Sequence, residues 1–147
     1  MTQKGQYTWT EITGQPEAWR VTLEAFTADR AALEDFLNKA DFAQILVVGC
    51  GSTHYLAQTA AAILTCRTRT PAYPLPSSEL WLFPDTVPPD QTLLLAVSRS
   101  GTTTETLRAL ERFRETYGGP VLAVTCYPQS PSAQQANFAL VTPGGQE

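Results

Sequence analysis

Histidine, positive charge and closely spaced cysteines are all scarce in this chain of 147 residues. His54 is the only histidine, and 10 Lys and Arg residues face 14 Asp and Glu residues, for a net charge of −4. A basic surface for nucleic acid or anionic lipid is therefore not expected. The three cysteines are far apart and lack the spacing of metal ligands, which argues against a zinc site or a disulfide framework. We expect no metal, no cofactor and no nucleic-acid partner.

Long apolar runs are missing as well. No run reaches the length of a membrane span, and the first residues lack the apolar core of a signal peptide. We therefore expect no membrane partner. Widely spaced cysteines fit a reducing compartment, so the sequence predicts a cytoplasmic protein. A chain of 147 residues, 43% of them hydrophobic, is long enough to form one domain with an ordinary core.

Four short aliphatic runs predict buried strands, and a weaker extended stretch covers residues 71–82. The four runs are 45–48, 93–97, 121–125 and 138–141. Helical patterns separate them, and no hairpin signal joins any two of them. This alternation predicts an α/β fold with a doubly wound parallel sheet. In such folds ligands bind at the carboxyl ends of the strands.

The first 40 residues read differently, as a helical extension. Apolar residues recur at steps of three and four over residues 19–37, interrupted only by Arg30, which predicts a long amphipathic helix. Gly14–Pro16 is expected to separate this helix from a short one that begins near Thr8. The apolar face must pack against the rest of the domain or against a second copy, and we expect a homodimer.

The segment Ser98–Thr106 is the most informative part of the sequence. It carries six hydroxyl side chains in nine residues and joins a predicted strand to a predicted helix. One Ser or Thr is enough to cap a helix, whereas several hydroxyls beside free helix N–H groups suit a ligand with several oxygens, such as phosphate. The alternative is a decorated cap on a Thr-rich surface turn.

A second loop, Gly49–His54, also follows a predicted strand. Its Gly-x-Gly start suggests a dinucleotide site, but the third glycine is missing and no acidic residue follows about 20 positions on. A serine-hydrolase elbow is absent too. His54 has two readings: an ordinary polar residue in the first turn of a helix, or an acid/base or sugar contact in the strand-end cleft.

Both loops, Gly49-Cys50-Gly51-Ser52-Thr53 and Ser98-Arg99-Ser100-Gly101-Thr102-Thr103-Thr104-Glu105-Thr106-Leu107, resemble the ligand loops of the sugar isomerase (SIS) domain family. The resemblance covers essentially the whole chain. It is closest to the first SIS domain of the isomerase part of glucosamine-6-phosphate synthase and of tagatose-6-phosphate ketose/aldose isomerase-like proteins. It implies a flavodoxin-like five-stranded parallel sheet, with a helical extension at 1–40 and a single SIS domain at 41–147. The second SIS domain of the family is expected to be absent.

The resemblance also implies a ligand and its binding residues. The ligand is a phosphorylated sugar, either a hexose 6-phosphate or an aminohexose 6-phosphate. The implied binding residues are Gly51, Ser52, Thr53, Ser98, Arg99, Ser100, Gly101, Thr102 and Thr103. At position 99 relatives often carry Gln, so the backbone N–H of Arg99 is a better candidate than its guanidinium.

The implied function is the first half of a sugar-phosphate aldose/ketose isomerase or of an aminosugar-phosphate-forming enzyme. The candidate bases are Glu147 and His54, with Glu105 nearby, and none matches the catalytic base of the family. We therefore expect the isolated chain to bind phosphosugar without turning it over. The alternatives are a non-catalytic phosphosugar sensor, which a missing DNA-binding motif makes less favoured, and a plain α/β scaffold.

Overall fold

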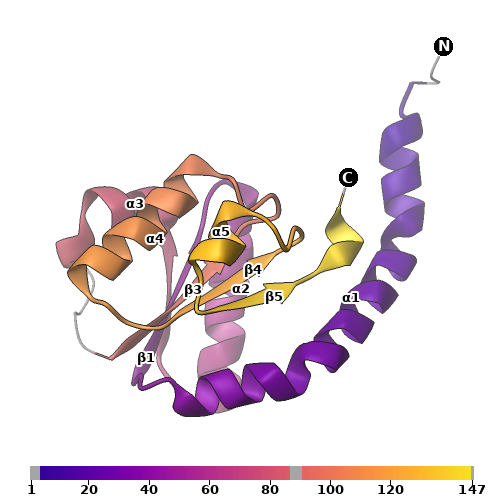
Figure 1. Cartoon of the computed structure of the whole chain (residues 1–147). Helices are drawn as coiled ribbons and strands as arrows, with labels where there is room; N and C mark the ends of the chain where they lie inside the picture. Colours follow the sequence, from indigo (N-terminus) through magenta and orange to yellow (C-terminus); the bar gives the residue numbers. More distant parts are fainter. Residues whose placement is uncertain (1–3, 87–90, 147) are drawn as a thin grey trace.

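Five parallel strands form a single sheet in the computed structural model of the chain, which describes residues 4–86 and 91–146 (Figure 1). The strand order is β2-β1-β3-β4-β5. The strands are β1 (Gln44–Gly49), β2 (Ala72–Pro76), β3 (Thr92–Val97), β4 (Val121–Thr125) and β5 (Phe138–Val141). The α/β fold class and the five-stranded parallel sheet predicted from the sequence are confirmed.

Helices connect the strands and cover both faces of the sheet. They are α1 (Gln6–Lys39), α2 (Ser52–Thr68), α3 (Ser77–Leu82), α4 (Thr104–Thr116) and α5 (Pro131–Gln135), with short 3₁₀ turns η1 (Pro84–Thr86) and η2 (Pro143–Gly145). Each of the connections β1–α2–β2 and β3–α4–β4 returns the chain to the same edge of the sheet, as parallel pairing requires.

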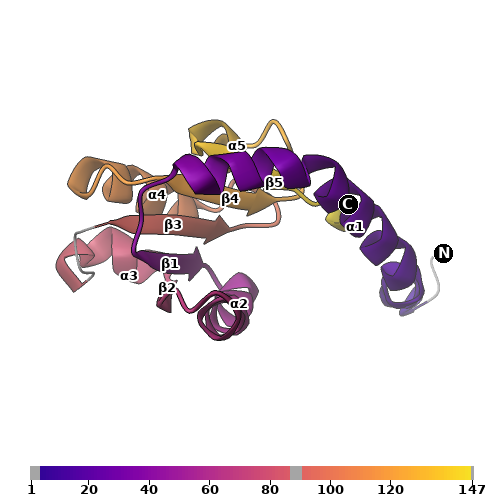
Figure 2. The ribbon, with the colours of Figure 1, turned by 90° about the horizontal axis from the view of Figure 1, so that it is seen from below.

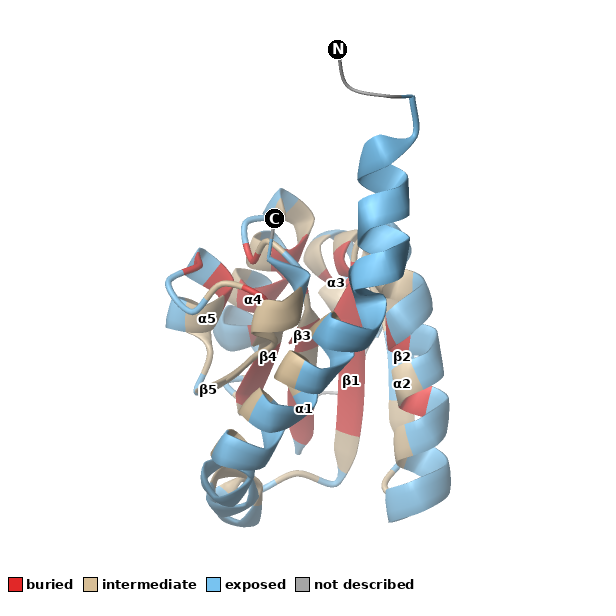
Figure 3. Ribbon diagram, turned by 90° about the vertical axis from the view of Figure 1, so that its right-hand side faces the viewer, coloured by how far each residue is buried: buried red, intermediate tan, exposed pale blue. Residues whose placement is uncertain are grey.

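Alternate residues of the central strands feed two separate hydrophobic clusters. Leu46 and Val48 point into the cluster formed with α3 and α4, where Phe113 is fully buried. Ile45 and Val47 point into the other cluster, with α2 and the C-terminal end of α1. Burial is concentrated in the strands and almost absent from α1 (Figure 3). Strands covered on both faces explain the continuous aliphatic runs in the sequence.

Helix α1 is one continuous helix, and the expected break at Gly14–Pro16 is wrong. Pro16 lies inside the helix. The helix also begins before Thr8, because Trp9 donates its backbone N–H to the carbonyl of Gly5 at 3.0 Å. A proline removes one intrahelical hydrogen bond, which a long helix absorbs by bending. Helix α1 curves along its length, and its N-terminal half extends beyond the sheet (Figures 1 and 2).

The stretch 71–82 is only partly extended. Strand β2 ends at Pro76, and Ser77–Leu82 forms α3 instead of continuing the strand. Leu80 is fully buried against the core cluster of α4, and this tertiary packing favours the helix over the weak extended pattern. Within residues 4–86 and 91–146, no helix combines the length and the hydropathy needed to cross a membrane.

Candidate functional site

The two loops singled out in the sequence lie side by side at the carboxyl edge of the sheet. Strand β1 continues to β2 on one side of the sheet, whereas β3 continues to β4 on the other. The order therefore reverses between β1 and β3, where Gly49 and Val97 are register partners. A crevice at the carboxyl ends of strands where the order reverses is the usual ligand site of an open α/β sheet. The loops after β1 and β3 lie at this position, so a ligand site is expected between them.

The hydroxyls of the loop after β3 hold the loop in shape. The backbone N–H of Gly101 donates to Ser98 Oγ at 3.1 Å, and Ser98 Oγ lies 3.3 Å from Thr103 Oγ1. Ser100 Oγ accepts the backbone N–H of Thr102 at 3.2 Å and its hydroxyl at 3.0 Å. Ser98 is buried, whereas Ser100 and Thr103 are half-buried. The predicted residues of this loop therefore form one connected cradle.

Only glycine fits the turn of this cradle at position 101. Its φ of +66° is in the left-handed region, and a Cβ at this position would collide with Ser130 Oγ and come within 2.6 Å of Ser132 Oγ. The carbonyl of Gly101 in turn accepts the backbone N–H of Ser132 at 3.0 Å. The loop after β3 thus packs directly against the start of α5, and no space is left between them for a side chain at position 101.

The loop after β1 is tied down by Thr53. The hydroxyl of Thr53 donates to the carbonyl of Cys50 and accepts its backbone N–H, both at 2.9 Å. A Cβ on Gly49 would lie 2.5 Å from the carbonyl oxygen of Thr53, so α2 starts in direct contact with the strand. Gly51 has a φ of +58°, and Ser52 is exposed. Thr53 therefore shapes this loop, while Ser52 and the backbone around Gly51 remain accessible.

Four buried hydroxyls that sequence reasoning missed support the cradle from behind. Ser77 Oγ lies 3.2 Å from Thr106 Oγ1, joining the end of β2 to α4. Thr125 donates its hydroxyl to the carbonyl of Arg99 at 3.1 Å. Ser130 and Ser132 lie below Gly101. All of them follow or end a strand, at the same edge, which is the signal that could have identified them.

An acidic residue joins the two loops. Burial raises the pKa of the Cys50 thiol, and the negative charge of Glu105 and a hydrogen bond to its carboxylate raise it further. Glu105 belongs to the first turn of α4, and Cys50 follows β1. The contact places the carboxylate of α4 beside the loop after β1. Cys50 itself stays a protonated thiol at neutral pH.

Of the two candidate bases, the structure describes His54 but not Glu147. His54 Nε2 lies 3.2 Å from Gln58 Nε2, and its buried Nδ1 has no hydrogen-bond partner within the described part of the chain. Glu147 lies outside the described residues.

An open groove of about 490 Å³ adjoins the cradle. Its lining comes from the loops after β3 and β4: Arg99, Ser100, Thr102, Tyr127, Gln129, Ser130 and Pro131. A second hollow, of about 330 Å³, lies near the amino ends of β1 and β3 and is mainly apolar. It holds none of the predicted binding residues. The first groove shares Ser100 and Thr102 with the cradle and therefore adjoins it on the side of β4.

The start of α4 gives the cradle its electrostatic character. Thr103 caps this helix in an extended conformation without a side-chain capping hydrogen bond, and its hydroxyl lies 3.3 Å from Ser98 Oγ instead. The first N–H groups of a helix are unpaired by geometry and carry the positive end of its dipole. Together with the surrounding hydroxyls they can hold an anion with several oxygens.

Comparison with known proteins places this geometry in a family. The family model described as the SIS domain matches residues 36–147. Glutamine--fructose-6-phosphate aminotransferase [isomerizing] from Pyrobaculum aerophilum is 33% identical over 138 residues, covering 93% of this chain and 22% of that protein. The same enzyme from Clostridium perfringens is 30% identical over 145 residues, covering 93% and 23%. The chain thus spans less than a quarter of the length of these relatives.

Two solved structures have the same fold over nearly the whole chain. Tagatose-6-phosphate ketose/aldose isomerase from Escherichia coli superposes with a TM-score of 0.85 at 28% identity, covering 96% of this chain and 41% of that one. The C-terminal domain of glucosamine-fructose-6-phosphate aminotransferase from Francisella tularensis also gives 0.85, at 27% identity, covering 99% and 42%. With the family match over residues 36–147, these similarities show that the chain belongs to the SIS domain family.

Proposed function

We propose that the chain binds a phosphorylated sugar, a hexose 6-phosphate or an aminohexose 6-phosphate, in the crevice between the loops after β1 and β3. The observation that carries the proposal is the cradle of Ser98, Ser100 and Thr103 around the start of α4. The phosphate sits over the first turn of α4. The sugar extends toward Ser52 and Gly51 on the opposite wall.

In this proposal the cradle receives the phosphate by rotation of its serine hydroxyls. The N–H groups of Gly101 and Thr102 donate to serine hydroxyls in the structure described here. A hydroxyl can rotate, so Ser98 and Ser100 can turn their hydrogens to the ligand while their lone pairs still accept these N–H groups. The preformed loop therefore keeps its internal hydrogen bonds and gains charge-assisted ones to the phosphate.

The larger function we propose is the first half of a sugar-phosphate isomerase or of an aminosugar-phosphate-forming enzyme. The names of the relatives support this, since they act on fructose 6-phosphate or tagatose 6-phosphate. In this proposal residues 41–147 are the binding domain, and residues 1–40 are its helical extension. We propose that the protein is cytoplasmic, because Cys50, Cys66 and Cys126 are all free thiols. We also propose that it forms a homodimer.

The binding proposal is tested by isothermal titration calorimetry with fructose 6-phosphate and glucosamine 6-phosphate. The S98A/S100A variant loses two hydroxyl donors, each contributing about 1.5–3 kcal/mol with a charged acceptor, so affinity should fall by at least 100-fold. Thr68→Ala is the matched control, because Thr68 is an exposed hydroxyl at the far end of α2. Equal affinity of the double variant and the wild type would contradict the proposal.

A turnover assay addresses the enzymatic part. Binding of the ground state lowers no barrier by itself, whereas a positioned acid or base contributes factors of about 10² to 10⁴. Among the described residues His54 and Glu105 are the nearby candidates, and neither matches the base of the family. We expect no conversion of a ketose phosphate to an aldose phosphate by the isolated chain. Turnover within seconds would contradict this, and His54→Ala and Glu105→Gln would then identify the base.

A further inference from the structure

One groove beside the cradle has no role in the proposed function. It measures about 490 Å³, and we call it the Tyr127 groove; its lining is Arg99, Ser100, Thr102, Tyr127, Gln129, Ser130 and Pro131. The loop after β3 has the loop after β1 on one side and the loop after β4 on the other. In the proposed function the sugar extends from the cradle toward Ser52, on the side of β1. The Tyr127 groove lies on the side of β4, so the sugar leaves it empty.

Hydrogen bonds within the chain hold both walls of the Tyr127 groove. On one wall, the carbonyl of Arg99 accepts the backbone N–H of Cys126 at 2.9 Å and the hydroxyl of Thr125 at 3.1 Å. On the other wall, the carbonyl of Tyr127 accepts the backbone N–H of Ser130 at 3.1 Å, which closes a tight turn. Ser130 is only 5% exposed, and its hydroxyl caps α5. A ligand would therefore enter a groove whose walls are already in place.

Flat side chains dominate the lining of the Tyr127 groove. Tyr127 contributes a phenol ring and Arg99 a planar guanidinium, and aromatic ligands stack on both groups. Gln129 adds an amide, which can donate and accept hydrogen bonds at the edge of a heteroaromatic ring. The volume lies within the range of about 300–1,000 Å³ that is typical of small-molecule sites. This lining suits a nucleobase.

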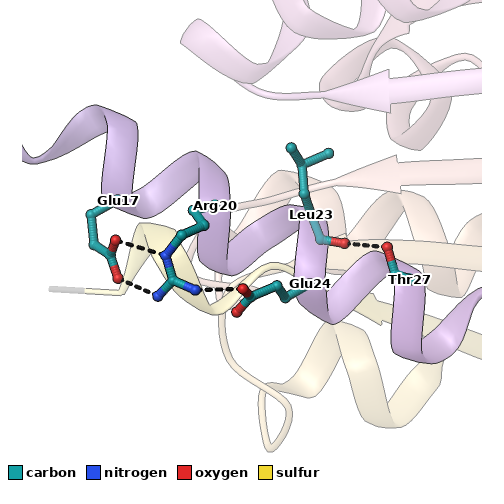
Figure 4. A network of polar contacts seen from close by, with 5 residues as sticks. All are labelled: Glu17, Arg20, Leu23, Glu24 and Thr27. Atoms are coloured by element: carbon teal, nitrogen blue, oxygen red, sulfur yellow. Dashed lines mark hydrogen bonds and ion pairs between the residues drawn. The ribbon is translucent and has the colours of Figure 1, made fainter.

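Arg99 is placed differently from an arginine on a helix surface. On α1, Arg20 pairs with both Glu17 and Glu24 along the exposed side of the helix (Figure 4). Arg99 lies instead in the loop after β3, between the hydroxyls of the cradle and the ring of Tyr127. A guanidinium can bind phosphate oxygens through its edge and stack on a ring through its face. The position of Arg99 therefore suits a ligand that carries both groups.

We propose that the Tyr127 groove binds the base of a 5′-nucleotide whose phosphate occupies the cradle. This inference rests on the proposed function, because it uses the same phosphate position. The base leaves the cradle toward Tyr127, whereas the sugar of a phosphosugar leaves it toward Ser52. Ser100 and Thr102 belong to both the cradle and the groove, so the ribose spans their hydroxyls. One phosphate fills the cradle, so the nucleotide competes with the phosphosugar and regulates its binding.

Isothermal titration calorimetry with AMP, UMP and ribose 5-phosphate tests the role of the base. Ribose 5-phosphate has the phosphate and the ribose of a nucleotide but lacks the base. Stacking of a base should make the tighter of the two nucleotides bind at least about 5-fold more tightly than ribose 5-phosphate. Saturating fructose 6-phosphate should abolish this binding. Equal affinity for the nucleotides and ribose 5-phosphate, or nucleotide binding that fructose 6-phosphate does not weaken, would overturn the proposal.

Variants of Tyr127 test the groove itself. Tyr127→Ala should remove the advantage of the nucleotide over ribose 5-phosphate, and Tyr127→Phe should keep it, because the ring remains. Both variants should keep the affinity of the wild type for fructose 6-phosphate, which also shows that they fold. Tyr7→Ala is the matched control, since Tyr7 is 75% exposed on α1. A loss of fructose 6-phosphate affinity in a folded Tyr127→Ala protein would show that the sugar occupies the groove, and would overturn the proposal.

Replacing Arg99 tests its second role. Arg99→Gln should lower the ratio of nucleotide affinity to ribose 5-phosphate affinity, because the guanidinium no longer stacks on the base. Arg20→Gln removes the same charge from the ion pairs of α1 and should leave the ratio unchanged (Figure 4). An unchanged ratio in Arg99→Gln would contradict stacking on the guanidinium.

The same titrations separate this inference from the proposed function. Binding of fructose 6-phosphate without any binding of AMP or UMP would overturn the nucleotide site and leave the proposed function standing. Binding of a nucleotide without any binding of fructose 6-phosphate or glucosamine 6-phosphate would contradict the proposed function and support the groove as a nucleotide site. Failure of all these ligands to bind would overturn both.

Discussion

The carboxyl edge of the sheet and the N-terminal half of α1 use their side chains in opposite ways. At the edge, polar residues are buried and satisfied: Ser98 and Thr125 are 2% and 1% exposed, and both bond to loop backbone. On α1, apolar residues such as Trp19 and Leu23 are left in water. Buried polar groups and exposed apolar rows both cost free energy unless something compensates.

The compensation comes from within the chain at the carboxyl edge, whereas the described part of the chain supplies none for the exposed apolar side chains of α1. At the edge, the strands fix the ends of four loops, so hydroxyls from distant parts of the sequence meet. On α1, nothing in the described part of the chain covers the exposed apolar side chains such as Trp19 and Leu23. We therefore propose that the first region is a ligand site formed before the ligand binds, and that the second region is covered by association with another chain or segment.

The largest difference in stability should appear when each of two phenylalanines is replaced by alanine. Phe113 is fully buried in the core cluster of α4, whereas Phe26 is 41% exposed on α1. Phe113→Ala should lower the free energy of unfolding by about 3–5 kcal/mol. Phe26→Ala should lower it by less than about 1 kcal/mol at protein concentrations too low for dimers. Urea denaturation measures the free energy of unfolding of both variants. Equal losses of stability would contradict the proposed difference between the two regions.

A smaller difference in stability, accompanied by a difference in ligand binding, should appear when two glycines with the same backbone conformation are each replaced by alanine. Gly101 and Gly118 have φ of +66° and +64°, but only Gly101 has neighbours that a Cβ would strike. Gly118→Ala should cost about 1–2 kcal/mol for the left-handed backbone alone. Gly101→Ala should cost about 1–3 kcal/mol more for overpacking against Ser130. It should also abolish phosphosugar binding, which Gly118→Ala should leave unchanged. Similar losses in both variants would mean that the cradle is not tightly packed.

The smallest effect concerns the thiol between the loops. Burial and Glu105 raise the pKa of Cys50, so the folded protein keeps this proton to higher pH than the unfolded chain. The resulting stability is fully present below the unfolded thiol pKa of about 8.5, and is lost as pH rises through the folded pKa.

Alkylation by iodoacetamide between pH 7 and 10 measures this difference. Cys50 should react at higher pH than the exposed Cys66, and Glu105→Gln should shift its profile to lower pH. An unchanged profile in Glu105→Gln would show that the carboxylate does not act on the thiol.

Local patterns were enough to predict most of the fold. The aliphatic runs marked β1, β3, β4 and β5 because strands buried on both faces need such runs. Ser77–Leu82 could not be assigned from local pattern, since its helix depends on Leu80 packing against the core. The continuity of α1 through Pro16 was missed because the rest of a long helix can compensate for one lost hydrogen bond.

The candidate site was predictable to the same extent. Hydroxyls in Ser98–Thr106 are dense enough in sequence to be recognised, and their clustering in the structure agrees with the expectation that they act together. Ser77, Ser130 and Ser132 are isolated in sequence, and only the parallel sheet brings them to the same edge. The contact of Glu105 with Cys50 likewise depends on the neighbouring positions of β1 and β3. Such contacts between distant residues are set by topology and cannot be seen in a local motif.

Backbone amide NMR with increasing fructose 6-phosphate tests the central claim, that the carboxyl edge and not α1 receives the ligand. The shifts should be largest for Ser98–Glu105 and for the loop Cys50–His54, and the amides of residues 6–28 should not move. Shifts confined to α1, or to the hollow around Gln44 and Thr92 at the other end of the strands, would contradict the account.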